Sequence, residues 1–117
     1  MDYQVVLSPS ARADLRDIAR YISLDAPDRA LEFGRFLISH TKSLARFPEL
    51  GRVVPEFGDN SIREIIVRSY RVIYRVSNSK NLVEVARFWH AARGIPQIDV
   101  ERQFSIGQSL SSILKQE

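Results

Sequence analysis

Ser61–Arg93 reads SIREIIVRSYRVIYRVSNSKNLVEVARFWHAAR, and this stretch decides the fold. It contains three runs rich in Ile, Val, Tyr, Phe and Trp, separated by polar breaks near Arg68–Ser69 and at Ser77–Asn81. Runs of β-branched and aromatic residues between polar turns are typical of adjacent antiparallel strands. The stretch therefore predicts a three-stranded meander.

Positive charge is concentrated in this meander. It carries seven basic and two acidic side chains, a net charge of +5, whereas the residues before it and those after it each sum to −1. Six of the seven cations are arginines, whose planar guanidinium suits forked contacts with phosphate or carboxylate. We therefore expect an acidic or phosphate-bearing partner. The candidate target- or nucleic-acid-binding residues are Arg63, Arg68, Arg71, Arg75, Arg87 and Arg93.

Alternation along the strands indicates where these side chains point, because successive strand residues face opposite sides of a sheet. In the middle run we expect Tyr70, Val72, Tyr74 and Val76 under helices, and Arg71, Ile73 and Arg75 on an open face. In the third run, Val83, Val85, Arg87 and Trp89 alternate with Glu84, Ala86, Phe88 and His90, and neither set is cleanly polar. The alternative for the arginines is an ion-pair ladder on the sheet surface, as is common for strand arginines.

Two helices are predicted upstream of the meander. Residues 2–7 read as a short strand, and Ser8-Pro9 predicts a helix start, since Ser is a favoured N-cap and Pro fits the first turn. Apolar stripes predict helices over Pro9–Leu24 and Pro27–Arg46. The second stripe is wide, so this helix lies between the first helix and the sheet or presents an apolar patch to another chain. Phe47–Gly51 ends the helix, and residues 53–60 are expected to form a loop.

The order β-α-α-β-β-β predicts an α+β domain, in which a helical hairpin packs on one face of a small, mostly antiparallel sheet. We expect residues 1–98 to form this domain. Residues 99–117 form a C-terminal tail, in which Phe104–Leu114 could line a short helix or belong to a mobile end.

Composition narrows the classes of function. The chain has 117 residues, enough for one domain, and it has no cysteine, which excludes disulfides and thiolate metal sites and fits a reducing compartment. Its N-terminus has neither a basic segment nor a long apolar run, so we expect a cytoplasmic protein without a membrane anchor. We expect no metal, cofactor or small-molecule substrate.

The residues also carry a family resemblance over roughly residues 3–98. The chain resembles the RelE/ParE superfamily of bacterial type II toxin–antitoxin toxins, often called plasmid stabilisation proteins. The pieces that carry it are VVLSPSA with the following helix, FPELGR at 47–52, Arg63-Glu64, YRVIYR at 70–75 and WHAAR at 89–93. The resemblance implies a growth-arresting toxin that a cognate antitoxin wraps and neutralises. A basic, partly apolar surface fits an acidic, amphipathic partner segment that folds on binding.

The resemblance implies two alternative mechanisms. A ParE-like toxin inhibits DNA gyrase without chemistry of its own, and the arginines would then be partner contacts. A RelE-like toxin cleaves messenger RNA in the ribosome without a metal, using cations on the phosphate and a general base and acid. The candidates for that chemistry are Arg63, Arg71 and Arg93 as phosphate contacts, Glu64 or His90 as base, and His90 as acid.

This sequence departs from the RelE-like pattern. It has no lysine between Lys42 and Lys80, its last tyrosine is Tyr74, and Ala91 follows His90 where another nuclease branch has a His-Tyr pair. The Pro48-Glu49, Tyr70-Arg71, His90 and Arg93 pattern is closer to the ParE-like branch. A ParE-like gyrase inhibitor is therefore the favoured expectation, with the RelE-like nuclease and a non-toxic basic binding domain as alternatives.

Overall fold

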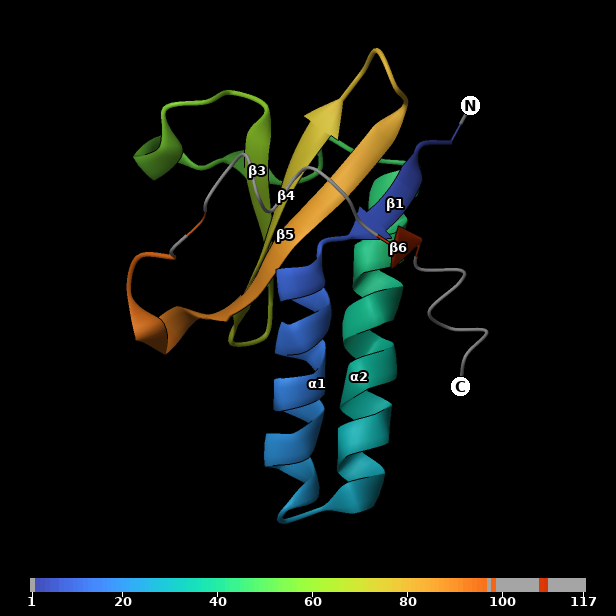
Figure 1. Cartoon of the computed structure of the whole chain (residues 1–117), viewed down its shortest axis with the longest axis vertical. Coiled ribbons are helices and arrows are strands. Elements are labelled where there is room, and N and C mark those ends of the chain that lie inside the picture. Colours follow the sequence, from blue (N-terminus) through green and yellow to red (C-terminus); the bar gives the residue numbers. More distant parts are fainter. Residues whose placement is uncertain (1, 97, 99–107, 110–117) are drawn as a thin grey trace.

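The computed structural model describes residues 2–96, 98 and 108–109 (Figure 1). The helices are α1 (Pro9–Ser23) and α2 (Pro27–Lys42), with short 3₁₀ helices η1 (Ser43–Ala45), η2 (Pro55–Phe57) and η3 (Ala91–Arg93). The strands are β1 (Gln4–Leu7), β2 (Arg52–Val53), β3 (Ile62–Val67), β4 (Tyr70–Ser77), β5 (Leu82–His90) and β6 (Gln108–Ser109).

The strands form one sheet in the order β2-β3-β4-β5-β1-β6. β1 runs parallel to β5, and every other neighbouring pair is antiparallel. α1 and α2 form an antiparallel hairpin whose tip reaches past the β3–β4 turn (Figure 1). The predicted α+β class, the order β-α-α-β-β-β and the meander of β3, β4 and β5 are confirmed.

The start of α1 follows the predicted chemistry. Ser8 is the N-cap, and its hydroxyl oxygen accepts a hydrogen bond from the Ala11 amide at 3.0 Å. The same hydroxyl donates to the Ala86 carbonyl at 2.8 Å, so this buried serine also ties the first turn of α1 to β5. α1 ends one residue before the predicted end. α2 ends at Lys42 and η1 continues it to Ala45, so the predicted α-helix to Arg46 was too long.

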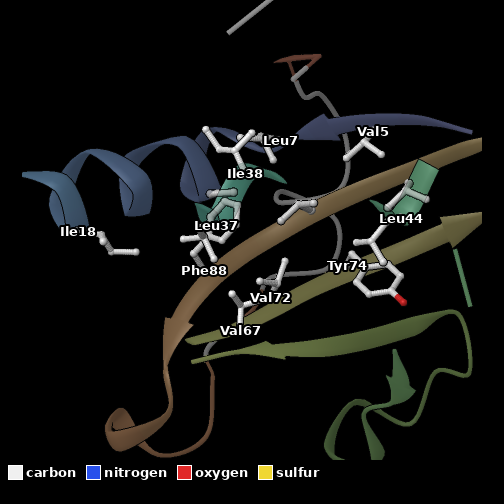
Figure 2. Packing of buried hydrophobic residues seen from close by; sticks show 13 residues of the cluster. Val5, Leu7, Ile18, Leu37, Ile38, Leu44, Val67, Val72, Tyr74 and Phe88 are labelled. Atoms are coloured by element: carbon white, nitrogen blue, oxygen red, sulfur yellow. The ribbon is translucent and has the colours of Figure 1, made fainter. Parts of the chain in front are cut away.

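The main hydrophobic core fills the space between the helical hairpin and one face of the sheet (Figure 2). Leu7, Leu37, Val72, Tyr74 and Phe88 come from four different elements and are at most 2% exposed. Val72 and Tyr74 lie under the helices as predicted, and Tyr70 and Val76 pack against the same cluster. The predicted buried face of β4 is confirmed.

The opposite face of the sheet differs from the prediction, because it carries a second small core in place of an open row of arginines. Ile73 is fully buried there with Val54, Ile62, Ala86 and Trp89. Phe57 and Ile98 pack against this cluster, so the segment containing η2 covers this face.

A β-bulge explains why simple alternation failed along β5. Tyr74 pairs with Val85 but Ile73 pairs with Arg87, so Ala86 is an extra residue without a partner on β4. The bulge shifts the side chains after it by one position. Phe88 therefore joins Val83 and Val85 in the main core, and Trp89 joins Ala86 on the other face.

Two segments outside the meander also differ from expectation. Arg52–Val53, at the start of the predicted loop, forms β2 and pairs with Arg63-Glu64 of β3. Gln108–Ser109, inside the possible helix 104–114, forms β6 and pairs with Val6 and Leu7. The rest of that possible helix lies outside the described residues. Among the described residues, neither helix combines the length and hydrophobicity that crossing a bilayer requires.

The FPELGR segment is shaped around Gly51. The Gly51 amide donates a hydrogen bond to the Tyr74 hydroxyl at 2.9 Å, and its carbonyl accepts one from Arg63 Nη1 at 2.7 Å. A Cβ atom at this position would overlap the Glu64 carbonyl oxygen and lie 2.7 Å from the Tyr74 hydroxyl oxygen. Glycine is required here because the β3 backbone at Glu64 and the Tyr74 hydroxyl both approach it closely.

Candidate partner-binding site

Glu64 neutralises part of the predicted arginine surface. Its side chain is fully buried, and one carboxylate oxygen accepts a hydrogen bond from Arg71 Nε. The other oxygen accepts one from Arg52 Nε at 2.7 Å and lies 2.6 Å from Arg52 Nη2. Burial alone would raise the pKa of Glu64, but the hydrogen bonds from Arg71 and Arg52 outweigh it and lower the pKa below its ordinary value. Arg71 is only 13% exposed and also lies 3.9 Å from Glu56.

Two further arginines of the predicted set are paired with carboxylates. Arg87 holds Asp14 of α1 through two bonds, Nε to Oδ2 at 2.8 Å and Nη2 to Oδ1 at 2.9 Å. Asp14 Oδ2 also accepts from the Phe88 amide at 3.0 Å. Arg75 Nη2 lies 3.7 Å from Glu84 Oε1 on the neighbouring strand. For these side chains and for Arg71, the alternative of internal ion pairs describes the structure better than a free basic face.

The remaining three arginines of the set have other surroundings. Arg63 faces the helix side of the sheet, opposite Tyr74, and donates to the Gly51 carbonyl. Arg68 is exposed, and its guanidinium lies 4.5 Å from the ring centre of Phe36. Arg93 is exposed and lies 3.8 Å from the ring centre of Trp89. Within residues 2–96, neither Arg68 nor Arg93 forms a salt bridge.

Arg68 and Arg93 each line one of two hollows that share Tyr70 as a wall; we call the pair the Tyr70 groove. The larger hollow, about 430 Å³, lies between the helical hairpin and the β3–β4 turn and is lined by Ile22, Arg29, Glu32, Phe33, Phe36 and Arg68–Tyr70. The smaller, about 180 Å³, lies between α1 and the end of β5 and is lined by Asp14, Asp17, Ile18, Tyr21, Tyr70, Phe88, His90 and Arg93. The groove thus combines an aromatic wall with a cation on each side of Tyr70.

Tyr70 and His90 form the centre of this groove. The two rings meet edge to face at 5.1 Å, and the Phe33 ring lies 5.7 Å from Tyr70. Burial, and then the neighbouring Tyr21, raise the pKa of Tyr70, so its hydroxyl stays protonated at neutral pH. His90 Nδ1 accepts a hydrogen bond from the Ala92 amide at 3.1 Å, which leaves Nε2 to carry the proton of the neutral ring.

The candidate nuclease residues are not gathered in one place. Glu64 lies opposite Ile73, on the face with the second core, whereas His90 contacts Tyr70 on the helix side. Their partner positions on β4, Ile73 and Tyr70, are three residues apart, or about 10 Å along a strand. The base and the acid of the predicted nuclease constellation therefore occupy opposite faces of the sheet.

Sequence reasoning missed the aromatic wall from α2 and the contribution of Tyr21. The one available signal was the wide apolar stripe of α2, which predicted either burial or an exposed patch. On α2, Phe33 and Phe36 are partly buried, whereas Leu31 is 51% exposed. Both alternatives for the stripe therefore hold in part. Among the described residues, no three His, Asp or Glu side chains cluster as a metal site would need.

Comparison with known proteins places these features in a family context. Residues 5–95 match the family model described as ParE toxin of type II toxin–antitoxin system, parDE. Toxin RelE2 of Caulobacter vibrioides is 36% identical over 91 residues, which cover 77% of this chain and 97% of that protein. The name of this relative is that of a RelE toxin.

Two solved structures share the fold. A structure of a chromosomal ParDE toxin–antitoxin system from P. aeruginosa matches with a TM-score of 0.64 at 18% identity, over 75% of this chain and 95% of that chain. The toxin–antitoxin complex RelBE2 from Mycobacterium tuberculosis matches with a TM-score of 0.52 at 23% identity, over 77% of this chain and 99% of that chain.

Proposed function

The chain belongs to the family of ParE toxins of type II toxin–antitoxin systems, and from this we propose that it arrests bacterial growth by inhibiting DNA gyrase. A cognate antitoxin neutralises it by covering the surface that contacts the target. The toxin contributes no covalent chemistry in this mechanism. Its exposed cations and aromatic side chains act as contacts.

The observation that carries this proposal is the internal pairing of the sheet arginines. A nuclease that cleaves RNA with its own 2′-hydroxyl needs free cations around the phosphate and a base within hydrogen-bond reach of the nucleophile. Here Arg71 is bound to Glu64, and Glu64 is buried with both oxygens occupied. A carboxylate held by two guanidiniums is a poor general base, because they stabilise its ionised form. This supports a contact mechanism over a catalytic one.

The surface left for target contact is therefore smaller than the sequence predicted. Arg68 and Arg93 are the members of the predicted set that are exposed and carry no carboxylate partner within residues 2–96. Both lie beside the Tyr70 groove. We propose Arg68 and Arg93 as the main contacts to gyrase, with Arg71, Arg75 and Arg87 acting chiefly to hold the sheet together.

RelE-like cleavage of ribosome-bound messenger RNA is the second candidate. The name of the Caulobacter relative favours it, as does the position of His90 in a groove that also contains Arg93. In that mechanism His90 would act as acid or base, and Arg93 would contact the phosphate. Glu64 and Arg71 would have no part in it, since both lie in the buried ion-pair network.

Inducible expression in a bacterial host tests the two mechanisms together. DNA synthesis and protein synthesis are pulse-labelled in the same culture after induction. Early loss of DNA synthesis with an induced damage response supports gyrase inhibition, and purified protein should then increase the fraction of cleaved DNA in a gyrase reaction. Early loss of translation, with gyrase unaffected in the purified reaction, overturns the gyrase proposal in favour of the nuclease.

A further inference from the structure

Three arginines form a row along the outer side of α1. Arg12, Arg16 and Arg20 recur every four residues, so each step turns only about 40° around the helix axis and rises about 6 Å. The opposite side of the same helix carries the buried residues Ala11 and Ile18. Arg16 and Arg20 are exposed and Arg12 is partly exposed. We call these three side chains the α1 row.

The carboxylates of α1 leave most of this positive charge without an internal anion. Asp14 is buried and binds a guanidinium of β5 through two hydrogen bonds, so it faces the sheet. Asp17 lies 3.9 Å from Arg20, but their side chains are 73% and 74% exposed, and water weakens such a contact. In the part of the chain that the structure describes, neither Arg12 nor Arg16 forms a salt bridge. The α1 row is therefore available to an external anion.

The α1 row does not contribute to the stability of its own helix. Like charges four residues apart repel each other across one turn and destabilise a helix. The row contains two such pairs, Arg12 with Arg16 and Arg16 with Arg20. A partner that carries anions in series relieves this repulsion. Phosphates suit it best, because a guanidinium donates two parallel hydrogen bonds to a phosphate group.

The surroundings of the α1 row favour the backbone of duplex DNA over other partners. Ala19 and Ser23 lie on the same side of the helix and are exposed, and both are small. A protein interface is centred on large aromatic or apolar anchors, and a single strand of nucleic acid stacks its bases on aromatic rings. The one aromatic residue of α1, Tyr21, lines the smaller hollow of the Tyr70 groove instead. A duplex backbone requires only cations that can approach its phosphates.

We propose that the α1 row contacts the phosphate backbone of double-stranded DNA. The row is about 12 Å long, and the phosphates of one strand recur about every 3.4 Å along the duplex axis, so the three arginines reach phosphates of one short segment. The inference rests on the proposed function in one respect, because gyrase is what places DNA beside the bound toxin. Two partners held together meet at an effective concentration on the order of millimolar, so even a weak DNA contact adds to the affinity.

Binding of the full chain to a short, fluorescein-labelled DNA duplex tests the proposal, by fluorescence anisotropy in about 10–100 mM salt, where few-contact complexes are measurable. The variants are Arg12→Gln, Arg16→Gln, Arg20→Gln and the triple variant. Arg46→Gln is the matched control, because Arg46 is an exposed arginine outside α1 and lines neither hollow of the Tyr70 groove. Urea unfolding shows whether each variant keeps the fold; the loss of like-charge repulsion should leave the midpoint unchanged or raise it.

The salt dependence of the affinity reports the number of phosphate contacts. Each contact contributes about −0.9 to the slope of log K against log salt, which at 0.1 M salt corresponds to about an eightfold change in affinity. Each single variant of the α1 row should lose ~0.9 of the slope and the triple variant ~2.7, whereas the control keeps the wild-type slope. A wild-type slope in the folded triple variant overturns the proposal. An equal loss in the control, or tighter binding of the wild-type chain to a single strand of the same sequence, also overturns it.

A purified gyrase reaction separates this proposal from the proposed function. More of the folded triple variant than of the wild type should be needed for the same fraction of cleaved DNA, and Arg46→Gln should match the wild type. Equal potency of the triple variant and the wild type overturns the contribution of the α1 row. If the triple variant loses duplex binding but the wild-type chain has no effect on gyrase, the gyrase target is refuted and the DNA-contacting surface stands.

Discussion

Replacing Gly51 with alanine should destabilise the protein, whereas the same replacement at Gly34 should not. At Gly51 the new methyl group overlaps the Glu64 carbonyl and presses on the Tyr74 hydroxyl. At Gly34, inside α2, a Cβ atom meets no heavy atom within 4 Å. The two variants add one methyl group each, so the difference between them reports the local surroundings.

The magnitude at Gly51 has two sources. Moving the loop away from β3 breaks the bond from the Gly51 amide to Tyr74, which leaves buried polar groups unpaired and costs about 1–3 kcal/mol. Forcing an extra methyl group into a packed site costs a further ~1–3 kcal/mol. Because relaxation of the loop reduces both contributions, we expect a loss of about 2–4 kcal/mol. Gly34→Ala should stabilise by about 0.5–1 kcal/mol through helix propensity.

Equilibrium unfolding in urea, followed by far-ultraviolet circular dichroism, measures the free energy of unfolding of both variants. The same denaturant slope (m-value) and baselines are used to fit each curve. Tyr74→Phe should reproduce about 1 kcal/mol of the Gly51 effect, because it removes the acceptor without adding volume. A Gly51→Ala variant within 0.5 kcal/mol of wild type would refute the close approach between this segment and β3. An equal loss of stability in Gly51→Ala and Gly34→Ala would show that the effect is common to glycine replacement and not specific to Gly51.

Three further changes test the ion pairs and the mechanism. Glu64→Gln should lower the free energy of unfolding by about 3–5 kcal/mol at neutral pH, because it leaves Arg71 buried without its anion. Because the folded state lowers the pKa of Glu64, its stabilisation is complete above the ordinary glutamate pKa and is lost as the pH falls through the lowered value. The stability of the variant should therefore depend less on pH in acid than that of the wild type, and an unchanged dependence would contradict the network. Asp14→Asn should lower stability by a similar amount through loss of the forked Arg87 pair, with gyrase inhibition per folded molecule unchanged; a specific activity loss at full folding would instead assign Asp14 to the target contact. His90→Ala should leave gyrase inhibition nearly intact, whereas a nuclease that uses His90 as acid or base should lose ~10²–10⁴-fold in rate.

The parts of the fold that depend on local chemistry could be predicted from sequence. Ser8 and Pro9 start α1 through contacts within one turn, and the polar breaks near Arg68 and after Ser77 separate the strands of the meander. The bulge at Ala86 could not be predicted, because the alternation of residues 82–90 is compatible with either register. It exchanged the faces of Phe88 and Trp89 relative to simple alternation.

The sequence predicted that arginines cluster in the meander, but it did not predict which of them are exposed on the surface. Asp14 and Arg87 are 73 residues apart in the chain, and only the packing of α1 along β5 brings them together. Arg71 and Glu64 are seven residues apart, and their meeting depends on the register of β3 against β4. Because of these pairings, Arg71 and Arg87 serve to hold the fold together, although the sequence gives no sign that they have carboxylate partners. Arg68 and Arg93 remain the exposed pair.

The position of β1 has a consequence for the timing of synthesis. This strand is made first, yet its parallel partner is Leu82–Val85, so the sheet cannot close until the ribosome has translated most of the chain. Pairings of such large sequence separation form late, because the intervening chain must first be ordered. A nascent or truncated chain lacks the assembled surface at Tyr70, which itself pairs with His90 near the end of β5. Any activity that depends on the surface at Tyr70 can therefore begin only after β5 has been synthesised.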